Sequence, residues 1–463
     1  MANYRARLNR RRLLGLIGTA GALAVAAACG SNNNKNTTSA TNTRTASTQA
    51  ATAATTSSAG TTPSAGSASD IAKQINDLVG PGGKQAGQGL KFKMGAVLAL
   101  SGSGSYYGDI MSKGINLAVK HIKAAGGPDI EVTYKDHKSG DAAAGAAAAR
   151  ELGIAKIPAC LASYAADIGA MLPAIAQYKM LTLDGGGGTS AAFKGKPYFW
   201  GTRAVTPDDC FPGVFKYVSQ KFPNVKRVSL IGWETGAELD KIVADDIQKA
   251  MAPYNLEFLG LETTAIGSTD FSTVLARVKD KNPDLIYLGE YGLDPGYLMK
   301  QYVTTGMNAI VIGSEYTPDA QKVAGDAYNK YNFAFDYFDV QNPPNPWSKL
   351  FVDEFRREYN QDPDFYAADY YENTFVIWEL IRRVLAKGGN PNDGAQLEQA
   401  LESDPSFKSV YGGDSNTVGT LALDPQSHSV SKRALGLFSV QNGKPTPLAF
   451  FDLNAQNFRI VGG

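Results

Sequence analysis

Polar side chains follow the apolar, strand-length runs of this sequence at the points where those runs end. They occupy residues 101–107, 163–164, 184–190, 233–234, 290–291 and 314–316. In open α/β sheets, ligands lie beyond the carboxyl ends of the strands. Glycines with Thr189 before a short helix would offer backbone N–H groups to a carboxylate, and a buried Glu315 would need a cation beside it. The pattern predicts a site for a small polar molecule; for any single group, turn residues and solvated charges are the alternative.

The motifs of common enzyme sites are absent from the sequence. The glycine-rich stretch 102–108 has its third glycine one place too late for a dinucleotide-binding loop, and Pro197 stands where a P-loop needs Ser or Thr. There is no G-x-S-x-G, H-E-x-x-H or C-x-x-C motif. Three scattered histidines argue against a His-rich metal site. We therefore expect neither catalysis nor a metal or cofactor. A hydrolase or amidase with catalytic residues from distant positions is the alternative.

Charge and cysteine content exclude further classes of protein. The 463 residues hold 45 Lys and Arg against 44 Asp and Glu, a net charge of +1, which argues against a nucleic-acid-binding protein. Three cysteines are too few for a disulfide scaffold. Whether Cys160 and Cys210 pair is open, because export favours a disulfide whereas positions in a strand and at a helix start could keep them apart.

From residue 91 onward, strand-like apolar runs alternate with helical patterns. Strands are expected at 93–100, 130–134, 157–161, 180–183, 228–231, 258–261, 285–288, 309–312 and 333–338. Helices are expected between them, including 141–152, 270–279 and 365–387, and Thr206 and Asn345 each precede a Pro at a helix start. This alternation is typical of a doubly wound parallel sheet. Because it restarts after residue 206, we expect two α/β lobes with a cleft between them.

The first 30 residues have the pattern of an export signal. Five arginines precede the apolar run at 13–28, and residues 1–28 contain no acid. The sequence RRRLL at 10–14 fits the core of a twin-arginine signal. AAAC at 26–29 is similar to a bacterial lipobox. We expect residues 1–28 to be a signal peptide and Cys29 to carry lipid that anchors the chain in a bilayer. An uncleaved N-terminal membrane anchor is the alternative.

Residues 29–89 are expected to be a low-complexity tether that follows the lipidated cysteine. Residues 31–69 contain no aromatic residue, Leu, Ile or Val, so they cannot bury enough apolar surface to offset the entropy of ordering them. A glycosylated stalk is the alternative. Either would hold the folded part away from the outer face of the cell membrane.

From about residue 91 to 441 the chain resembles a family of periplasmic solute receptors, the branched-chain amino-acid-binding components of ABC importers. The stretches that carry the resemblance are GAVLALSGSGSYYGD at 95–109, YKDHKSGDAAAGAAAARELG at 134–153, DGGGGTSAAF at 184–193, TDFSTVLARVKDKNPDLIYLGEYG at 269–292 and IGSEY at 312–316. Their order and spacing, more than any one of them, indicate the family.

The resemblance implies the fold of a type I periplasmic binding protein, with two doubly wound parallel-sheet lobes joined by a three-strand hinge. Lobe 1 would comprise residues 90–205 and 339–433, and lobe 2 residues 206–338 and 434–442. Residues 443–463 would form a C-terminal tail. The three hinge crossings would lie near residues 205, 338 and 433.

The resemblance also implies a set of ligand-binding residues. The loop that holds the ligand carboxylate falls on Gly187 and Thr189, and the acid that pairs with the ligand ammonium falls on Glu315. The serine loop falls on Ser163, with Ala162 as the alternative register. The positions that match are Tyr107, Ser163, Gly187, Thr189, Tyr291 and Glu315. After the first strand of lobe 2 the family often has an aromatic residue followed by glycine, whereas this chain has WETGA at 233–237, where Trp233 is the candidate for the aromatic residue that covers the ligand.

The function implied is that of a lipid-anchored, exported receptor that closes on a small organic ligand and delivers it to an ABC permease. The ligand expected is an amino acid, with branched-chain amino acids as one candidate. Asp184 and Glu290 add acids beside the expected site, which would favour a ligand with more positive charge or more hydroxyls, and the four glycines at 185–188 would leave the pocket roomy. Amides and aromatic acids are therefore further candidates. The alternative function is a ligand sensor coupled to a membrane signalling partner.

Overall fold

The computed structural model describes residues 68–163, 165–186, 194–204 and 207–461 of the chain. Within these residues, no helix is long and apolar enough to cross a membrane. Among these described residues, no group of three or more His, Cys, Asp or Glu side chains is placed to hold a metal ion. The expected signal peptide, Cys29 and most of the expected tether lie outside the described residues, as do Gly187 and Thr189.

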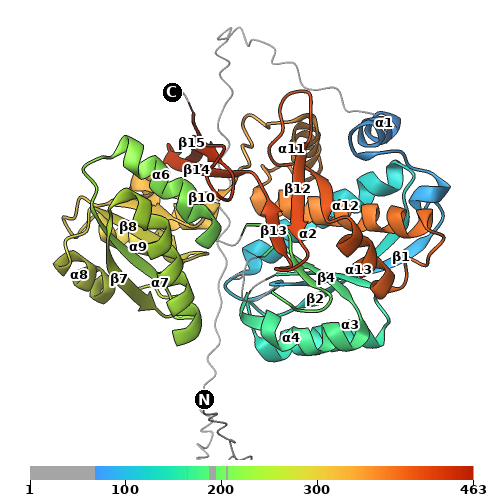
Figure 1. Cartoon of the computed structure of the whole chain (residues 1–463), viewed down its shortest axis with the longest axis horizontal. Helices are drawn as coiled ribbons and strands as arrows, with labels where there is room; N and C mark the ends of the chain where they lie inside the picture. The colour runs from blue at the N-terminus through green and yellow to red at the C-terminus, as the bar shows by residue number, and fades with distance from the viewer. Residues whose placement is uncertain (1–67, 164, 187–193, 205–206, 462–463) are drawn as a thin grey trace, which may run out of the picture. The chain divides into compact units, whose positions relative to one another are not determined.

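Five parallel strands form the first sheet (Figure 1). In their order across the sheet they are β2 (Asp129–Asp136), β1 (Lys91–Leu98), β3 (Ala159–Ala162), β4 (Leu181–Asp184) and β5 (Phe199–Gly201). Parallel neighbours require long crossover connections, which here contain α2 (Ser105–Ala124), α3 (Ala142–Ile154) and α4 (Ala165–Tyr178). β3 and β4 are buried along their whole length, as expected for strands covered on both faces.

Five further parallel strands and three antiparallel ones form the second sheet. In their order across the sheet they are β16 (Arg459–Ile460), β15 (Lys444–Phe451), β14 (Leu435–Gln441), β10 (Tyr331–Asp336), β9 (Ile310–Gly313), β8 (Leu285–Gly289), β6 (Arg227–Trp233) and β7 (Glu257–Thr264). The helices of this part are α6 (Phe211–Lys221), α7 (Ala237–Met251), α8 (Ser272–Asp280), α9 (Asp294–Tyr302) and α10 (Pro318–Ala324). A 3-10 turn, Asp208–Cys210, precedes α6, whose start was expected at residue 206.

The C-terminal segment does not end outside the sheets. We expected residues 443–463 to be a tail, but β15 pairs with β14 and β16 pairs with β15, both antiparallel. Ala449 and Phe451 of β15 are fully buried, and burial of such side chains is favourable by about 1.5–3 kcal/mol for a large apolar one. The second sheet is therefore mixed, with an antiparallel edge added to a parallel core.

The chain returns to the first sheet after β10. There it forms α11 (Pro346–Tyr359), α12 (Phe365–Ala386) and α13 (Gly394–Ser403), followed by a small antiparallel sheet of β11 (Ser406–Ser409), β12 (Gly419–Asp424) and β13 (Ser429–Lys432). α12 packs along α2, and α13 contacts β4, so these orange-to-red helices lie beside elements from the first half of the chain in Figure 1. Asn345 caps α11 by accepting from the backbone N–H groups of Trp347 and Ser348.

A helix occupies the end of the segment expected to be a tether. Residues Ala68–Val79 form α1, and its Ile71 and Ile75 are buried. Arg382 of α12 donates to the carbonyls of Val79 at 3.0 Å and Gly80 at 2.8 Å, which fixes the C-terminal end of α1. The prediction of a tether over residues 68–79 is therefore wrong, because the apolar residues at a spacing of four give this segment a face to bury.

The two cysteines of the folded part do not pair. Cys160 and Cys210 are free and buried. Cys160 belongs to the apolar core between the first sheet and helices α3 and α4, whereas Cys210 belongs to the core of the second sheet. The open question of a disulfide is thus answered in the negative.

Candidate functional site

Both sheets share one order of parallel strands. In the first, β1 lies between β2 and β3; in the second, β6 lies between β7 and β8. In each sheet the second strand therefore lies on one side of the first strand, and the third strand lies on the other side. The loops that follow the first and third strands at the carboxyl edge consequently diverge. This divergence is the topological switch point at which open α/β sheets bind ligands.

Four of the expected site residues lie at these two switch points. In the first sheet, Tyr107 lies in the first turn of α2, the helix that follows β1 in the chain, and Ser163 directly follows β3. In the second sheet, Trp233 is the last residue of β6, and Tyr291 follows β8 by two residues. Equivalent positions of two separate sheets therefore carry side chains suited to polar and aromatic contacts.

Ser163 forms a buried pair with His137. The Nε2 atom of His137 lies 3.1 Å from Oγ of Ser163, and the backbone N–H of Gly140 donates to Nδ1 of His137 at 2.8 Å. Burial lowers the pKa of His137 to about 4, so the ring is neutral at pH 7. Because Nδ1 accepts, the ring hydrogen lies on Nε2 and is donated to Ser163. An imidazole that donates to a serine cannot remove its proton, so the pair does not form an activated nucleophile.

Glu315, which lies two residues after β9, accepts hydrogen bonds from three separate segments. The hydroxyl of Tyr107 and the backbone N–H of Gly292 both donate to Oε1, the latter at 2.5 Å. The hydroxyl of Tyr366, in the first turn of α12, donates to Oε2 at 2.9 Å. Tyr107, Tyr366 and Glu315 are buried, with 5%, 3% and 1% of their residue surface exposed. These bonds join a loop of the second sheet to helices that pack with the first.

Arg203 is the cation that lies near Glu315. Burial raises the pKa of Glu315 to about 7, while the three donors and the Arg203 guanidinium act in the opposite direction. The guanidinium carbon of Arg203 lies 4.3 Å from the ring centroid of Phe335 and 5.3 Å from that of Tyr366. Its Nη1 donates to the carbonyl of Gly186 at 3.3 Å. The chain thus supplies its own positive charge beside the buried acid.

At the switch point of the second sheet, two aromatic rings meet two acids. The ring centroids of Trp233 and Tyr291 are 5.3 Å apart, and Nε1 of Trp233 donates to Oδ2 of Asp294 at 2.7 Å. The Thr264 hydroxyl donates to Oε1 of Glu290 at 2.5 Å. Burial raises the pKa of Glu290 to about 8, with a smaller contribution from Asp294, so this carboxyl is mostly protonated at pH 7.

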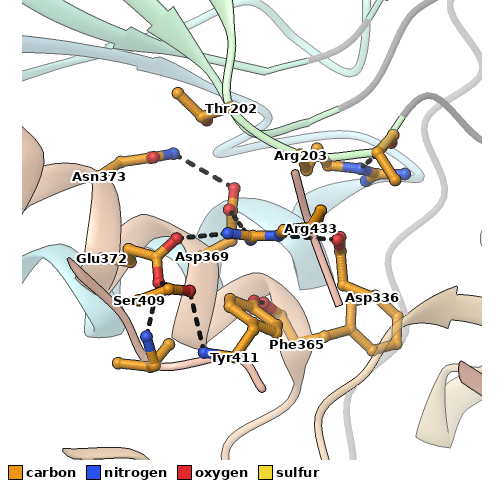
Figure 2. A network of polar contacts seen from close by, with 12 residues as sticks. Thr202, Arg203, Asp336, Phe365, Asp369, Glu372, Asn373, Ser409, Tyr411 and Arg433 are labelled. Carbon is orange, nitrogen blue, oxygen red and sulfur yellow. Dashed lines mark hydrogen bonds and ion pairs between the residues drawn. The ribbon is translucent and has the colours of Figure 1, made fainter. Parts of the chain in front are cut away.

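A second buried charge cluster surrounds Arg433, between β13 and β14 (Figure 2). Its Nε donates to Oδ1 of Asp336 at 2.9 Å and its Nη2 to Oδ1 of Asp369 at 2.8 Å, while Nη1 donates to Oε1 of Glu372. Asp336 ends β10 of the second sheet, whereas Asp369 and Glu372 belong to α12. The cluster therefore ties the second sheet to α12 where the chain passes between the two sheets.

The structure brings the expected residues into two groups. Tyr107 and Glu315 are hydrogen-bonded, and Trp233 and Tyr291 are in ring contact. Ser163 is bonded to His137 instead of to another expected residue. The contributors that sequence reasoning missed are His137, Arg203 and Tyr366. Arg203 lies two residues after the end of β5, a strand-end position that could have marked it as a site candidate.

A sequence model for the family described as periplasmic binding protein matches residues 91–442 of the chain. Leu/Ile/Val-binding protein homolog 3 from Brucella melitensis is 22% identical over 219 residues, which cover 47% of this chain and 55% of that protein. The chain thus spans about half the length of this curated relative.

Two solved structures have similar folds. The substrate-binding protein LivJ of a branched-chain amino acid transporter from Streptococcus pneumoniae, in complex with isoleucine, has a TM-score of 0.65 and 24% identity. It covers 77% of this chain and 97% of its own. A solute-binding protein of an ABC transporter from R. palustris, in complex with 4-hydroxybenzoate, has a TM-score of 0.67, 20% identity, and covers 78% of this chain and 97% of its own. At these identities the likeness establishes the two-lobed α/β fold.

Proposed function

The chain belongs to the periplasmic binding protein family, and from this premise we propose that it is the extracytoplasmic solute-binding receptor of an ABC importer. The observation that carries the proposal is the pair of topological switch points, one in each sheet, with Tyr107 and Ser163 at one and Trp233 and Tyr291 at the other. Two such edges that face a shared ligand would close on it as the hinge bends, and the ligand would stabilise closure only through contacts with both.

In this proposal the first sheet with α1–α4, α11–α13 and the small sheet is lobe 1, and the second sheet with its helices is lobe 2. The hinge consists of the passages after β5, after β10 and between β13 and β14. Lobe 1 would contribute Ser163, Tyr107 and the loop with Gly187 and Thr189, and lobe 2 would contribute Trp233 and Tyr291. We propose that the ligand is released chemically unchanged. The donor role of His137 toward Ser163 supports this, because it leaves this serine without a base that could activate it.

The proposed ligand is a small carboxylic acid. An amino acid is the first candidate, because relatives carry the name Leu/Ile/Val-binding protein. An aromatic acid is the second candidate, favoured by the ring pair of Trp233 and Tyr291 together with the structural neighbour that holds 4-hydroxybenzoate. Aromatic side chains offer large apolar contact area and stack on aromatic ligands.

We further propose that the receptor is exported through a twin-arginine signal at residues 1–28 and anchored by lipid on Cys29. An ABC permease in the membrane would receive the ligand from the closed receptor. The basic start, the short apolar run and the position of Cys29 directly after small residues support this arrangement.

Calorimetric titration of the full chain tests the ligand proposal, with L-isoleucine and 4-hydroxybenzoate as probes. We expect saturable binding of at least one probe at one molecule per chain. Ser163→Ala and Tyr291→Ala should weaken that binding, whereas Lys408→Ala should not, because Lys408 donates to Leu78 of α1 at 2.7 Å, away from both switch points. No heat with either probe would contradict the proposed ligand class.

A further inference from the structure

We propose that Glu315 is a latch, meaning that the hydrogen bonds which its side chain accepts from lobe 1 hold the two lobes together. We propose further that ligand recognition does not depend on pairing a ligand ammonium with this carboxylate. The proposal rests on the receptor function proposed above and narrows it: the site would accept small carboxylic acids with or without an amino group.

The donors to Glu315 come from both sides of the proposed hinge. Tyr107 belongs to α2 and Tyr366 to α12, two helices that pack along each other in lobe 1. Their rings are in edge-to-face contact, with centroids 5.0 Å apart, so both hydroxyls are presented together. Glu315 and Gly292 lie on neighbouring loops of lobe 2, after β9 and β8. Two of the three hydrogen bonds to the carboxylate therefore cross from one lobe to the other.

The backbone of Glu315 is held in place within lobe 2. The hydroxyl of Tyr331, from β10, donates to the carbonyl of Glu315 at 2.7 Å. A Cβ atom at Gly313 would lie 1.9 Å from that hydroxyl, so only glycine permits this approach. A side chain on such a fixed support presents its carboxylate to lobe 1 in one orientation, as a latch requires.

The hydrogen-bonding capacity of the carboxylate is largely used by the protein itself. An ionised carboxylate has about four lone-pair sites, and three donors of the chain already use both oxygens. Arg203 places a guanidinium near the same group, and Arg203 itself packs on the ring of Tyr366. The site that remains on Oε2 is buried beside the Tyr366 hydroxyl and near the positive charge of Arg203, so a ligand ammonium would have to approach the carboxylate against that charge. Selection of the ligand therefore falls to the remaining groups at the switch points.

Small-angle X-ray scattering of the full chain without added ligand tests the latch. The variant Tyr107→Phe/Tyr366→Phe keeps both rings and removes both lobe-crossing donors. We expect its radius of gyration to exceed that of the wild type. Tyr106→Phe is the matched control, because Tyr106 neighbours Tyr107 on α2 but donates to Asp364, within lobe 1, at 2.7 Å. Equal radii for the double variant and the control, both folded by circular dichroism, would overturn the latch.

Titration of the same variants separates the latch from ammonium recognition. Loss of closure weakens all ligands alike, and Tyr107→Phe keeps the ring that Tyr107 would present to a ligand while removing only the hydroxyl bonded to Glu315. The affinities for L-isoleucine and 4-hydroxybenzoate should therefore fall by the same factor, about tenfold for each hydroxyl removed. In Glu315→Gln, a loss confined to L-isoleucine would overturn the proposal. If only one of the two probes binds, the radius of gyration of the variants alone decides whether Glu315 is a latch. If neither probe binds, the proposed ligand class is contradicted, and the scattering result on the latch still holds.

Discussion

Replacement of Arg433 by Met should destabilise the fold more than any surface substitution of the same kind. The Arg433 side chain is fully buried, and its guanidinium contacts Asp336, Asp369 and Glu372 (Figure 2). Met has a similar apolar stem but no charge, so the substitution isolates the ionic contribution. Three acid side chains would remain in the interior without their shared partner.

The expected loss follows from the burial of the cluster. Removal of one partner of a buried ion pair costs about 3–5 kcal/mol, because the remaining charge is left uncompensated. Burial raises the pKa of Asp369 to about 8, so this acid is mostly protonated at pH 7 and contributes less to the loss than an ionised one. The loss should therefore arise chiefly from Asp336 and Glu372.

Urea unfolding at pH 7, followed by far-ultraviolet circular dichroism, measures the free energy of unfolding. Arg277→Met is the matched control: Nε of Arg277 lies 2.6 Å from Oε2 of Glu262, but the Arg277 side chain is 47% exposed. Exposed pairs contribute about 0–1 kcal/mol. A loss for Arg433→Met that does not exceed that of Arg277→Met would refute the reasoning.

Three further predictions follow from buried groups. Asn345→Ala should cost about 2 kcal/mol or more in urea unfolding, because it removes the cap of α11 and the Nδ2 bonds to the carbonyls of Val410 and Gly412; a cost no larger than that of Asp141→Ala, the cap of α3, would contradict this. Between pH 7 and 8.5 the urea midpoint should fall, since burial raises the pKa of Glu290 and Asp369 to about 8 and the folded state holds protons that the unfolded state releases; a midpoint that stays constant or rises over this range would contradict the raised pKa values. Iodoacetamide should label Cys160 and Cys210 only in urea, because both are buried and the pKa of Cys160 is raised to about 12; labelling of the native protein, mapped on peptides, would contradict their burial.

The nine strands expected between residues 93 and 338 and most helices are predictable from the sequence because their apolar periodicity is local, whereas β5 and β11–β14 were not expected. The cap of α11 at Asn345 and the residues at four strand ends follow from the same local signals. Helix α1 was missed because its apolar residues directly follow a long stretch that has none. Strands β15 and β16 were missed because they are added at the edge of the second sheet, and no local sequence pattern indicates that pairing.

The contacts within the candidate site were less predictable. The resemblance placed Tyr107 and Glu315 in one site, but their direct bond joins residues 208 positions apart. Tyr366 and Arg203 complete the group from two further segments. The position of Arg203 after β5 marks it as a residue at a strand end, but no local signal places it or Tyr366 beside Glu315. The direction of the His137–Ser163 bond depends on a third group, the N–H of Gly140, which only the fold brings to the ring.

A thermal-shift screen of the full chain tests the central claim most directly, which is that this chain is a receptor for small organic acids. A ligand that binds only the folded state raises Tm by mass action. We predict that amino acids or aromatic acids raise Tm in proportion to the logarithm of their concentration above Kd, while sugars leave it unchanged. A screen in which no amino acid, amide or aromatic acid raises Tm, or in which only sugars do, would contradict the claim.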